Sequence, residues 1–311
     1  MARAQSSIDS AGRGLRARTR ELSDLQFALL LSLPVLLFLV VIVAYPLVYA
    51  VWLSLNRVKF FGGYRATLVW FDNYVDVLSD GDFWWSAWVS VRFTVESVVL
   101  AMLVGLALAL VMRHNRRWIG LIRTLILLPW SVSLYGTGIM FFYLVRGQTG
   151  LGTTVAHVFG VDEPVNLLNQ TWVIEALAVG NAWNMAPLVA FFLYASMSTI
   201  PRRLYDLAAI DQMSGVETFR NVTLPPIRFT LFVFTCITTV LSLKLFDYIF
   251  VMTGGGPGTS SATLTYQLYK ISFRDLKLGE GAAMSFLLLF MIVGSTFLLY
   301  FVWGKREASR P

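Results

Sequence analysis

Charged residues are scarce in this sequence. Asp, Glu, Lys and Arg make up 14% of its 311 residues, whereas hydrophobic residues make up 57% and the mean hydropathy is +0.66. A soluble domain averages about 25% charged residues, so this chain lacks the polar side chains that a water-exposed surface requires. The composition excludes an ordinary soluble domain and indicates a membrane protein.

Cysteine and histidine are nearly absent. The single cysteine, Cys236, lies within an apolar run and has no second cysteine with which to form a disulfide. The two histidines, His114 and His157, are far apart in sequence, which argues against a metal site and against a Ser-His-Asp set. We therefore expect no catalytic residue, no metal and no cofactor-binding residue in this chain.

Two further signatures are missing. The glycine-rich stretch 254–258 is not followed by the Gly-Lys-Ser/Thr of a phosphate-binding loop, so the chain is not itself an ATPase. No stripe of Lys and Arg with interleaved aromatics lies on a soluble domain, so we expect no nucleic-acid partner.

Long uncharged runs supply the candidate membrane spans, since a helix needs about 20 apolar residues to cross the bilayer. Residues 25–55, 124–145, 176–201 and 281–304 carry no charge, and two further runs hold one charged pair each, Arg92 with Glu96 and Lys244 with Asp247. The first run is too long for a signal-peptide core, which has about 7–15 residues, so we expect it to remain as a helix. The expected fold is an all-α membrane protein with six transmembrane helices at about 27–52, 87–112, 121–145, 173–197, 229–252 and 281–303.

The distribution of basic residues predicts the orientation. With six helices and the N-terminus inside, segments 1–24, 113–123, 200–228 and 304–311 hold 16 Lys and Arg, whereas the outer segments 56–85, 143–171 and 253–280 hold 7. Because basic residues collect on the cytoplasmic side, both termini are expected there. The predicted organisation is a cytoplasmic tail at 1–24, a transmembrane domain at 25–303 and a second tail at 304–311.

The inner segment 200–228 is long and structured. Thr199 and Pro201 suit a helix start, and Ser214 followed by Glu217 is the capping-box pattern that starts a second helix. Leu224-Pro225-Pro226 is expected to stop that helix, because proline lacks the amide proton and clashes with the preceding turn. The pattern predicts helix, turn, helix and stop before the next span, as either a docking surface or an amphipathic loop lying on the membrane.

The spacing within this segment resembles the "EAA" loop of ABC importer permeases, whose pattern is Glu-Ala-Ala-x-x-Asp-Gly followed by Ile-x-Leu-Pro. Asp206-Leu207-Ala208 stand at Glu-Ala-Ala, Asp211 at the aspartate and Gln212 at the usual glycine. Other stretches are similar to the sugar-type branch, namely Phe71-Asp72-Asn73-Tyr74, 123–130, 196–201, 244–248 and Thr253 to Pro257. The resemblance covers the chain from about residue 25 and indicates a family, not a substrate.

The resemblance implies a MetI-like permease fold and a transport subunit without enzymatic activity of its own. It implies a second permease, two ATPase subunits that bind ATP and Mg, and an extracytoplasmic solute-binding protein, all at the bacterial cytoplasmic (inner) membrane. The solute would be a sugar, polyol or related carbohydrate. Segment 200–228, the coupling loop, would dock on an ATPase subunit through Tyr205, Asp206, Leu207, Ala208, Ala209, Asp211, Gly215, Leu224 and Pro225.

Polar residues inside the spans have two interpretations. An ionisable residue in a span is costly and is most often paired or functional, so Lys244 with Asp247, and Arg92 with Glu96, either hold helices together or line a translocation path. Amides beside an aromatic ring suit a hydroxyl-rich solute but equally suit interhelical hydrogen bonds. The candidate path residues are Asn181, Trp183, Asn184, Lys244, Asp247 and Tyr248.

Two other functions remain open from the residues alone. An ion-coupled secondary transporter would use Lys244 and Asp247 as a proton relay and would show inverted repeats and broken helices. A membrane-embedded enzyme or assembly factor would need catalytic residues clustered on one face, and the sequence offers none. The secondary-transporter alternative gives no reason for the inner segment 200–228.

Overall fold

The structure is a computed structural model, and it describes residues 23–59, 65–113, 119–147, 150–160, 162, 164 and 166–304. The expected tails at 1–24 and 304–311 lie almost wholly outside these residues. The chain divides into two compact units, residues 1–52 and 53–311.

The described part of the first unit is one long apolar helix, whose last two residues, 53 and 54, are counted with the second unit. It begins with a capping box in which Ser23 N–H donates to Gln26 Oε1 (3.2 Å) and Ser23 Oγ accepts from Gln26 N–H (3.3 Å). It continues through α2 (Asp24–Leu39), the π-helical segment η1 (Val40–Ala44) and α3 (Tyr45–Ser54). Side chains 24–49 are all exposed, as expected of a helix surrounded by lipid.

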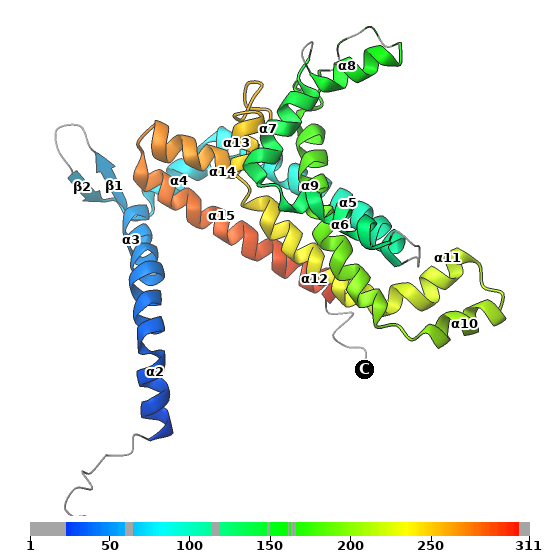
Figure 1. Cartoon of the computed structure of the whole chain (residues 1–311). Helices are drawn as coiled ribbons and strands as arrows, with labels where there is room; N and C mark the ends of the chain where they lie inside the picture. The colour runs from blue at the N-terminus through cyan, green and yellow to red at the C-terminus, as the bar shows by residue number, and fades with distance from the viewer. Residues whose placement is uncertain are drawn as a thin grey trace, which may run out of the picture. The chain divides into compact units, whose positions relative to one another are not determined.

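The second unit is a helix bundle (Figure 1). Its long helices are α5 (Gly81–Arg113), α9 (Val173–Ser198), α12 (Leu224–Leu243) and α15 (Leu278–Leu299). Its shorter elements are α4 (Asp72–Ser79), α6 (Ile119–Ser131), α7 (Leu134–Val145), α8 (Leu151–Val158), α10 (Arg202–Ile210), α11 (Gly215–Thr218), η2 (Phe219–Thr223), α13 (Asp247–Met252), α14 (Leu264–Tyr269), η3 (Lys270–Arg274) and η4 (Tyr300–Gly304).

Small residues bring α5 and α9 together. Ala101, Gly105 and Ala109 recur every four residues on α5, and the buried alanines 178, 182, 186 and 190 do the same on α9. A Cβ atom at Gly105 would lie 2.7 Å from Cγ1 of Val189, so the two backbones approach as closely as glycine allows. Such rows of small residues drive helix packing in membranes, where the hydrophobic effect between helices is missing.

Two of the expected continuous spans are interrupted. The span at 121–145 is two helices, α6 and α7, bent by 94°. The span at 229–252 ends at Leu243, and α13 starts a new helix at Asp247. Among the described residues, five helices are long and apolar enough to cross a membrane, or six if the bent pair is one span.

The expected stop at Leu224-Pro225-Pro226 is wrong. The chain is helical from Gly215 to Leu243, through α11, η2 and α12. Pro225 and Pro226 occupy the first turn of α12 directly after the wider π-helical turn η2. Proline is tolerated in a first helical turn, and the widened turn shifts the hydrogen-bond partners there. Thr199 does not cap α10 either, because its Oγ1 donates to Ser196 O at the end of α9 (2.8 Å).

The all-α expectation has one exception, a short antiparallel hairpin. Strand β1 (Asn56–Lys59) pairs with β2 (Arg65–Leu68), with Asn56 opposite Leu68. Asn73 of α4 fastens the hairpin base by donating from Nδ2 to the carbonyls of Ser54 (2.8 Å) and Asn56 (3.1 Å). Thus the Phe71-Asp72-Asn73-Tyr74 stretch has a structural role in the second unit.

A charged cluster joins α5 to α9. Arg92 Nε donates to Glu96 Oε1 (2.8 Å), and its Nη2 donates to Glu175 on α9. The Arg92–Glu96 pair was expected from the i,i+4 spacing, whereas Glu175, 83 residues away, was not. Because both carboxylates share one guanidinium, removing Arg92 would leave two like charges close together.

We expect Arg92→Gln to lower the free energy of unfolding of the detergent-solubilised protein by about 1–2 kcal/mol. This loss is smaller than that for breaking a fully buried ion pair, because these side chains are about one third exposed. The midpoint of thermal denaturation should fall by about 2–8 °C. The matched control is Arg57→Gln, which breaks a more exposed bridge to Asp76 and should cost less than about 1 kcal/mol. Equal losses of stability in the two variants would contradict the inference that Arg92 stabilises the contact between α5 and α9.

Candidate functional site

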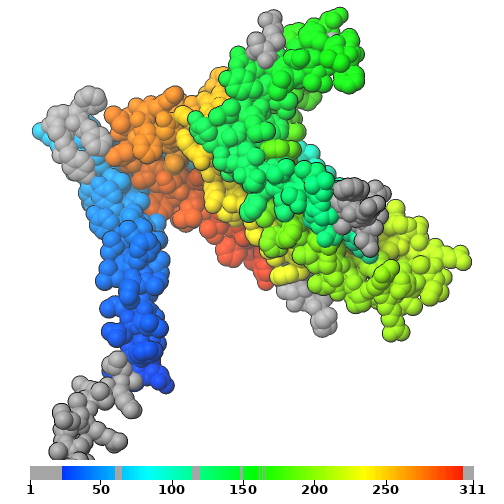
Figure 2. Space-filling view, viewed as in Figure 1, coloured from blue at the N-terminus to red at the C-terminus, as the bar shows by residue number. Residues whose placement is uncertain are grey.

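The coupling loop stands out from the bundle. Helices α10 and α11 project together where α9 ends and α12 begins, at the end of the bundle away from α8 (Figure 1). In the space-filling view the same residues, in yellow-green, form a protruding lobe (Figure 2). We call this end of the second unit the α10–α11 end.

Helix α10 has a buried face and an exposed face. Tyr205 is half-buried and Ala208 is buried, so this i,i+3 pair faces the bundle. The opposite face exposes Leu207 (46%) and Ile210 (75%), together with Asp206 and Asp211. An exposed apolar patch flanked by carboxylates is typical of a protein-docking surface.

Hydrogen bonds fix the turn after α10. Gln212 N–H donates to Ala209 O (3.1 Å) and Met213 N–H donates to Ala208 O (2.9 Å), which is the Schellman pattern that ends a helix. Gln212 has φ +52°, the left-handed conformation for which glycine is preferred. The residue at the family's usual glycine position therefore takes the glycine conformation although it is glutamine.

The second helix starts as the sequence predicted. Ser214 N–H donates to Glu217 Oε2 (2.8 Å), and Ser214 Oγ accepts from Glu217 N–H (3.3 Å). The capping box of α11 begins at Ser214, four residues after the last residue of α10, so both sides of the turn are held by local hydrogen bonds. Val216 on α11 is 77% exposed and extends the exposed apolar patch beyond the residues predicted from sequence.

The remaining predicted coupling residues lie around this turn. Ala209 and Gly215 are exposed, Pro225 is exposed at the base of α12, and Leu224 is half-buried. The structure therefore brings the predicted residues to one end of the bundle but divides them between an exposed face and a face that contacts the bundle.

The amides predicted for a path are engaged inside the chain. Asn184 Nδ2 donates to the carbonyls of Pro129 (2.9 Å) and Val132 (3.0 Å), and Asn181 Nδ2 donates to Ser242 Oγ (3.0 Å). Asn184 thus donates to two carbonyl groups at the α6–α7 bend. Such groups must find partners because lipid offers none.

Tyr248 is also buried. Its hydroxyl donates to Leu177 O (3.0 Å), and a Cβ atom at Gly180 would lie 2.1 Å from that hydroxyl oxygen. Gly180 is therefore what lets the tyrosine approach α9. Trp183 is half-buried and packs on Phe141, with ring centroids 5.7 Å apart.

Lys244 and Asp247 flank the break between α12 and α13. Both are exposed, and neither forms an ion pair with the other or with another described residue. The break itself is stabilised from α14, where Thr265 Oγ1 donates to Leu245 O (2.8 Å). The interpretation of Lys244 and Asp247 as an ion pair that holds helices together is therefore wrong for the isolated chain.

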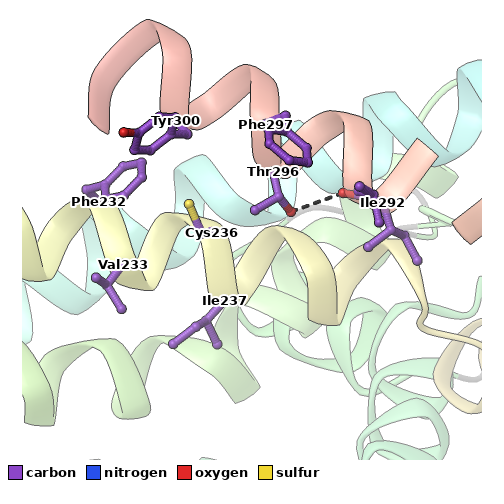
Figure 3. A pocket seen from close by; sticks show the side chains of 9 residues that line it. Phe232, Val233, Cys236, Ile237, Ile292, Thr296, Phe297 and Tyr300 are labelled. Atoms are coloured by element: carbon purple, nitrogen blue, oxygen red, sulfur yellow. Dashed lines mark hydrogen bonds between the residues drawn. The ribbon is translucent and has the colours of Figure 1, made fainter. Parts of the chain in front are cut away.

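A groove of about 630 Å³ lies between α12 and α15 (Figure 3). It is lined by hydrocarbon and aromatic side chains, by the thiol of Cys236 and by Thr296, whose Oγ1 donates to Ile292 O (3.0 Å). A solute site needs several converging polar groups, and this lining has no charged or amide side chain, so it is not a candidate solute site.

Comparison with known proteins places the chain in a family. Residues 97–302, more than half of the chain, match the family of binding-protein-dependent transport system inner membrane components. A sulfoquinovosyl glycerol transport system permease protein of Agrobacterium fabrum is 30% identical over 285 residues, covering 90% of this chain and 92% of the relative. A trehalose/maltose transport system permease protein of Thermococcus litoralis is 32% identical over 281 residues, covering 89% and 92%.

The fold has a solved counterpart. A bacterial ABC transporter involved in the import of the acidic polysaccharide alginate has a chain that superposes with a TM-score of 0.77 at 18% sequence identity, covering 92% of this chain and 96% of that one. The broken helices alone would also have suited a secondary transporter, but the family match favours the importer. The chain belongs to the family of binding-protein-dependent transport system inner membrane components, as a multi-pass permease subunit of an ABC importer of the sugar-type branch.

Proposed function

We propose that the α10–α11 end of this permease docks on an ATPase subunit at the cytoplasmic face of the inner membrane. The observation that carries the proposal is the exposed apolar patch of Leu207, Ile210 and Val216 beside two carboxylates, on helices fixed by a Schellman turn and a capping box. A rigid, protruding element can transmit a movement of the ATPase subunit to the permease without deforming. Both termini are then cytoplasmic, in agreement with the excess of basic residues on that side.

The assembly we propose has four kinds of partner. They are a second permease subunit, two ATPase subunits that bind ATP and Mg, an extracytoplasmic solute-binding protein, and the surrounding lipid. A solved relative of the fold is an alginate ABC transporter in complex with a pentasaccharide-bound periplasmic protein, which supports the binding protein by analogy.

The proposed solute is a sugar, polyol or related carbohydrate. The relatives are named for sulfoquinovosyl glycerol, for trehalose and maltose, and for sn-glycerol-3-phosphate. In the proposed path, the side chains that face the solute or the second permease are the exposed Lys244 and Asp247 and the half-buried Trp183. The side chains that position the helices around the path are Asn181, Asn184 and Tyr248.

The proposed function predicts ATP-driven uptake. In proteoliposomes that contain the purified complex and its binding protein, a carbohydrate or polyol should stimulate ATP hydrolysis and enter the vesicle, and a protonophore should leave uptake intact. Uptake that follows an ion gradient and proceeds without ATP would instead favour the secondary transporter.

The docking patch is tested by Ile210→Glu. A charge placed in a desolvated contact should cost at least about 2 kcal/mol of binding, so the ATPase recovered with the permease should fall at least about tenfold. Val216→Glu should behave alike.

The matched control for this test is Val158→Glu, an equally exposed aliphatic residue (80%) on α8 at the opposite end of the bundle. It should leave ATPase recovery unchanged. Equal recovery with Ile210→Glu and Val158→Glu would reject the patch as the docking surface.

The left-handed turn predicts an unusual order of variants at Gln212. Gln212→Gly should stabilise the end of α10 by about 1 kcal/mol, and Gln212→Asn should be neutral. Gln212→Val introduces a β-branched side chain and should destabilise the end of α10 by more than about 1 kcal/mol. Hydrogen exchange of the Gln212 and Met213 amides, which make the Schellman bonds, reports this directly. Faster exchange in Gln212→Gly than in Gln212→Val would contradict the assigned turn.

A further inference from the structure

The underside of α10 is not a continuous packed core. A groove of about 670 Å³ lies there, lined by the end of α5, by α10 and by the α11–η2 helix. Side chains that bridge this groove therefore offer a route by which a movement of α10 reaches the bundle.

Tyr205 is such a bridging side chain. Its ring centroid lies 3.6 Å from Cζ of Arg113, the last residue of α5, and its hydroxyl lies 3.1 Å from Oγ1 of Thr223, the buried last residue of η2. One residue of α10 thus contacts both α5 and the helix that continues into α12.

The contact with Arg113 is a specific one. The ring faces a guanidinium that forms no ion pair with a described carboxylate, and a cation over an aromatic face is attracted by the ring quadrupole. Tyr205 points away from the exposed Leu207–Ile210 face, so its position does not suit a direct contact with a docked ATPase.

We propose that Tyr205 is a positioning residue that transmits displacement of α10 to α5 through Arg113 and to α12 through Thr223. This inference rests on the proposed function, because an ATPase must move α10. Since α5 packs on α9 through small residues with little space between the backbones, a shift at Arg113 passes to two of the long helices of the bundle.

The test uses the full complex and ATP with Mg and vanadate, so it does not depend on knowing the solute. In a Cys236→Ser background, spin labels at Val111→Cys on α5 and Leu298→Cys on α15, both exposed sites, report the distance between the helices before and after vanadate trapping. Wild type should show a second distance population after trapping. Tyr205→Leu should reduce that population about fivefold per trapped nucleotide.

Companion variants separate the stack from general damage. Tyr205→Phe keeps the ring over Arg113 and should retain the population within about twofold. For the α5–α15 distance, Arg113→Gln should match Tyr205→Leu, and the double variant should lose no more than either single variant, because both remove the stack that acts on α5. Tyr143→Leu removes a similar aromatic–arginine contact, to Arg146 at the opposite end of the bundle, and should have no effect.

Several outcomes would overturn the inference. They are a wild-type complex that traps vanadate without a distance change, a full response in Tyr205→Leu, and losses from Arg113→Gln and Tyr205→Leu that multiply. A Tyr205→Phe variant as defective as Tyr205→Leu would reject the stack with Arg113. Failure of the proposed function is distinguishable, because in that case no ATPase accompanies even the wild-type chain and no nucleotide is trapped.

Discussion

At two helix breaks in the described part of the chain, a buried polar side chain donates hydrogen bonds to backbone carbonyl groups. Asn184 on α9 bonds two carbonyls at the α6–α7 bend, and Thr265 on α14 bonds Leu245 O between α12 and α13. Lipid offers no substitute partner, so these breaks exist only while α9 and α14 stay in place. The arrangement of the second unit therefore depends on satisfying the backbone as much as on apolar packing.

The turn within the coupling loop, in contrast, is held by hydrogen bonds between residues that are close together in the sequence. Its exposed face carries large apolar side chains, and its shape is set by local hydrogen bonds around Gln212 and Ser214. Local caps keep a short helix in one shape without burying its outer face. That combination leaves the apolar patch available to a partner and at the same time keeps it rigid enough to be moved as one body.

The features that arise within a few residues were the ones that the sequence could predict. The capping box at Ser214 and Glu217, the helical coupling loop and the apolar spans all follow from local patterns. The breaks near 132 and 244 do not, because the side chains that stabilise them come from 20 to 55 residues away. Residue propensity likewise does not predict the left-handed conformation of Gln212, because that conformation is preferred by glycine. Pro225 and Pro226 misled the prediction because a π-helical turn precedes them.

The same reasoning bears on where a solute is recognised. Side chains whose hydrogen-bond donors are already engaged by the backbone offer little to a passing ligand, because binding it would first break a buried hydrogen bond. Asn184 and Tyr248 are in that position, whereas Lys244 and Asp247 keep exposed charges at a helix break without an ion pair among the described residues. Exposed charges in a membrane bundle are costly unless a partner or a water-filled cavity receives them. We therefore infer that a second permease subunit or a hydroxyl-rich solute receives these charges at the α12–α13 break.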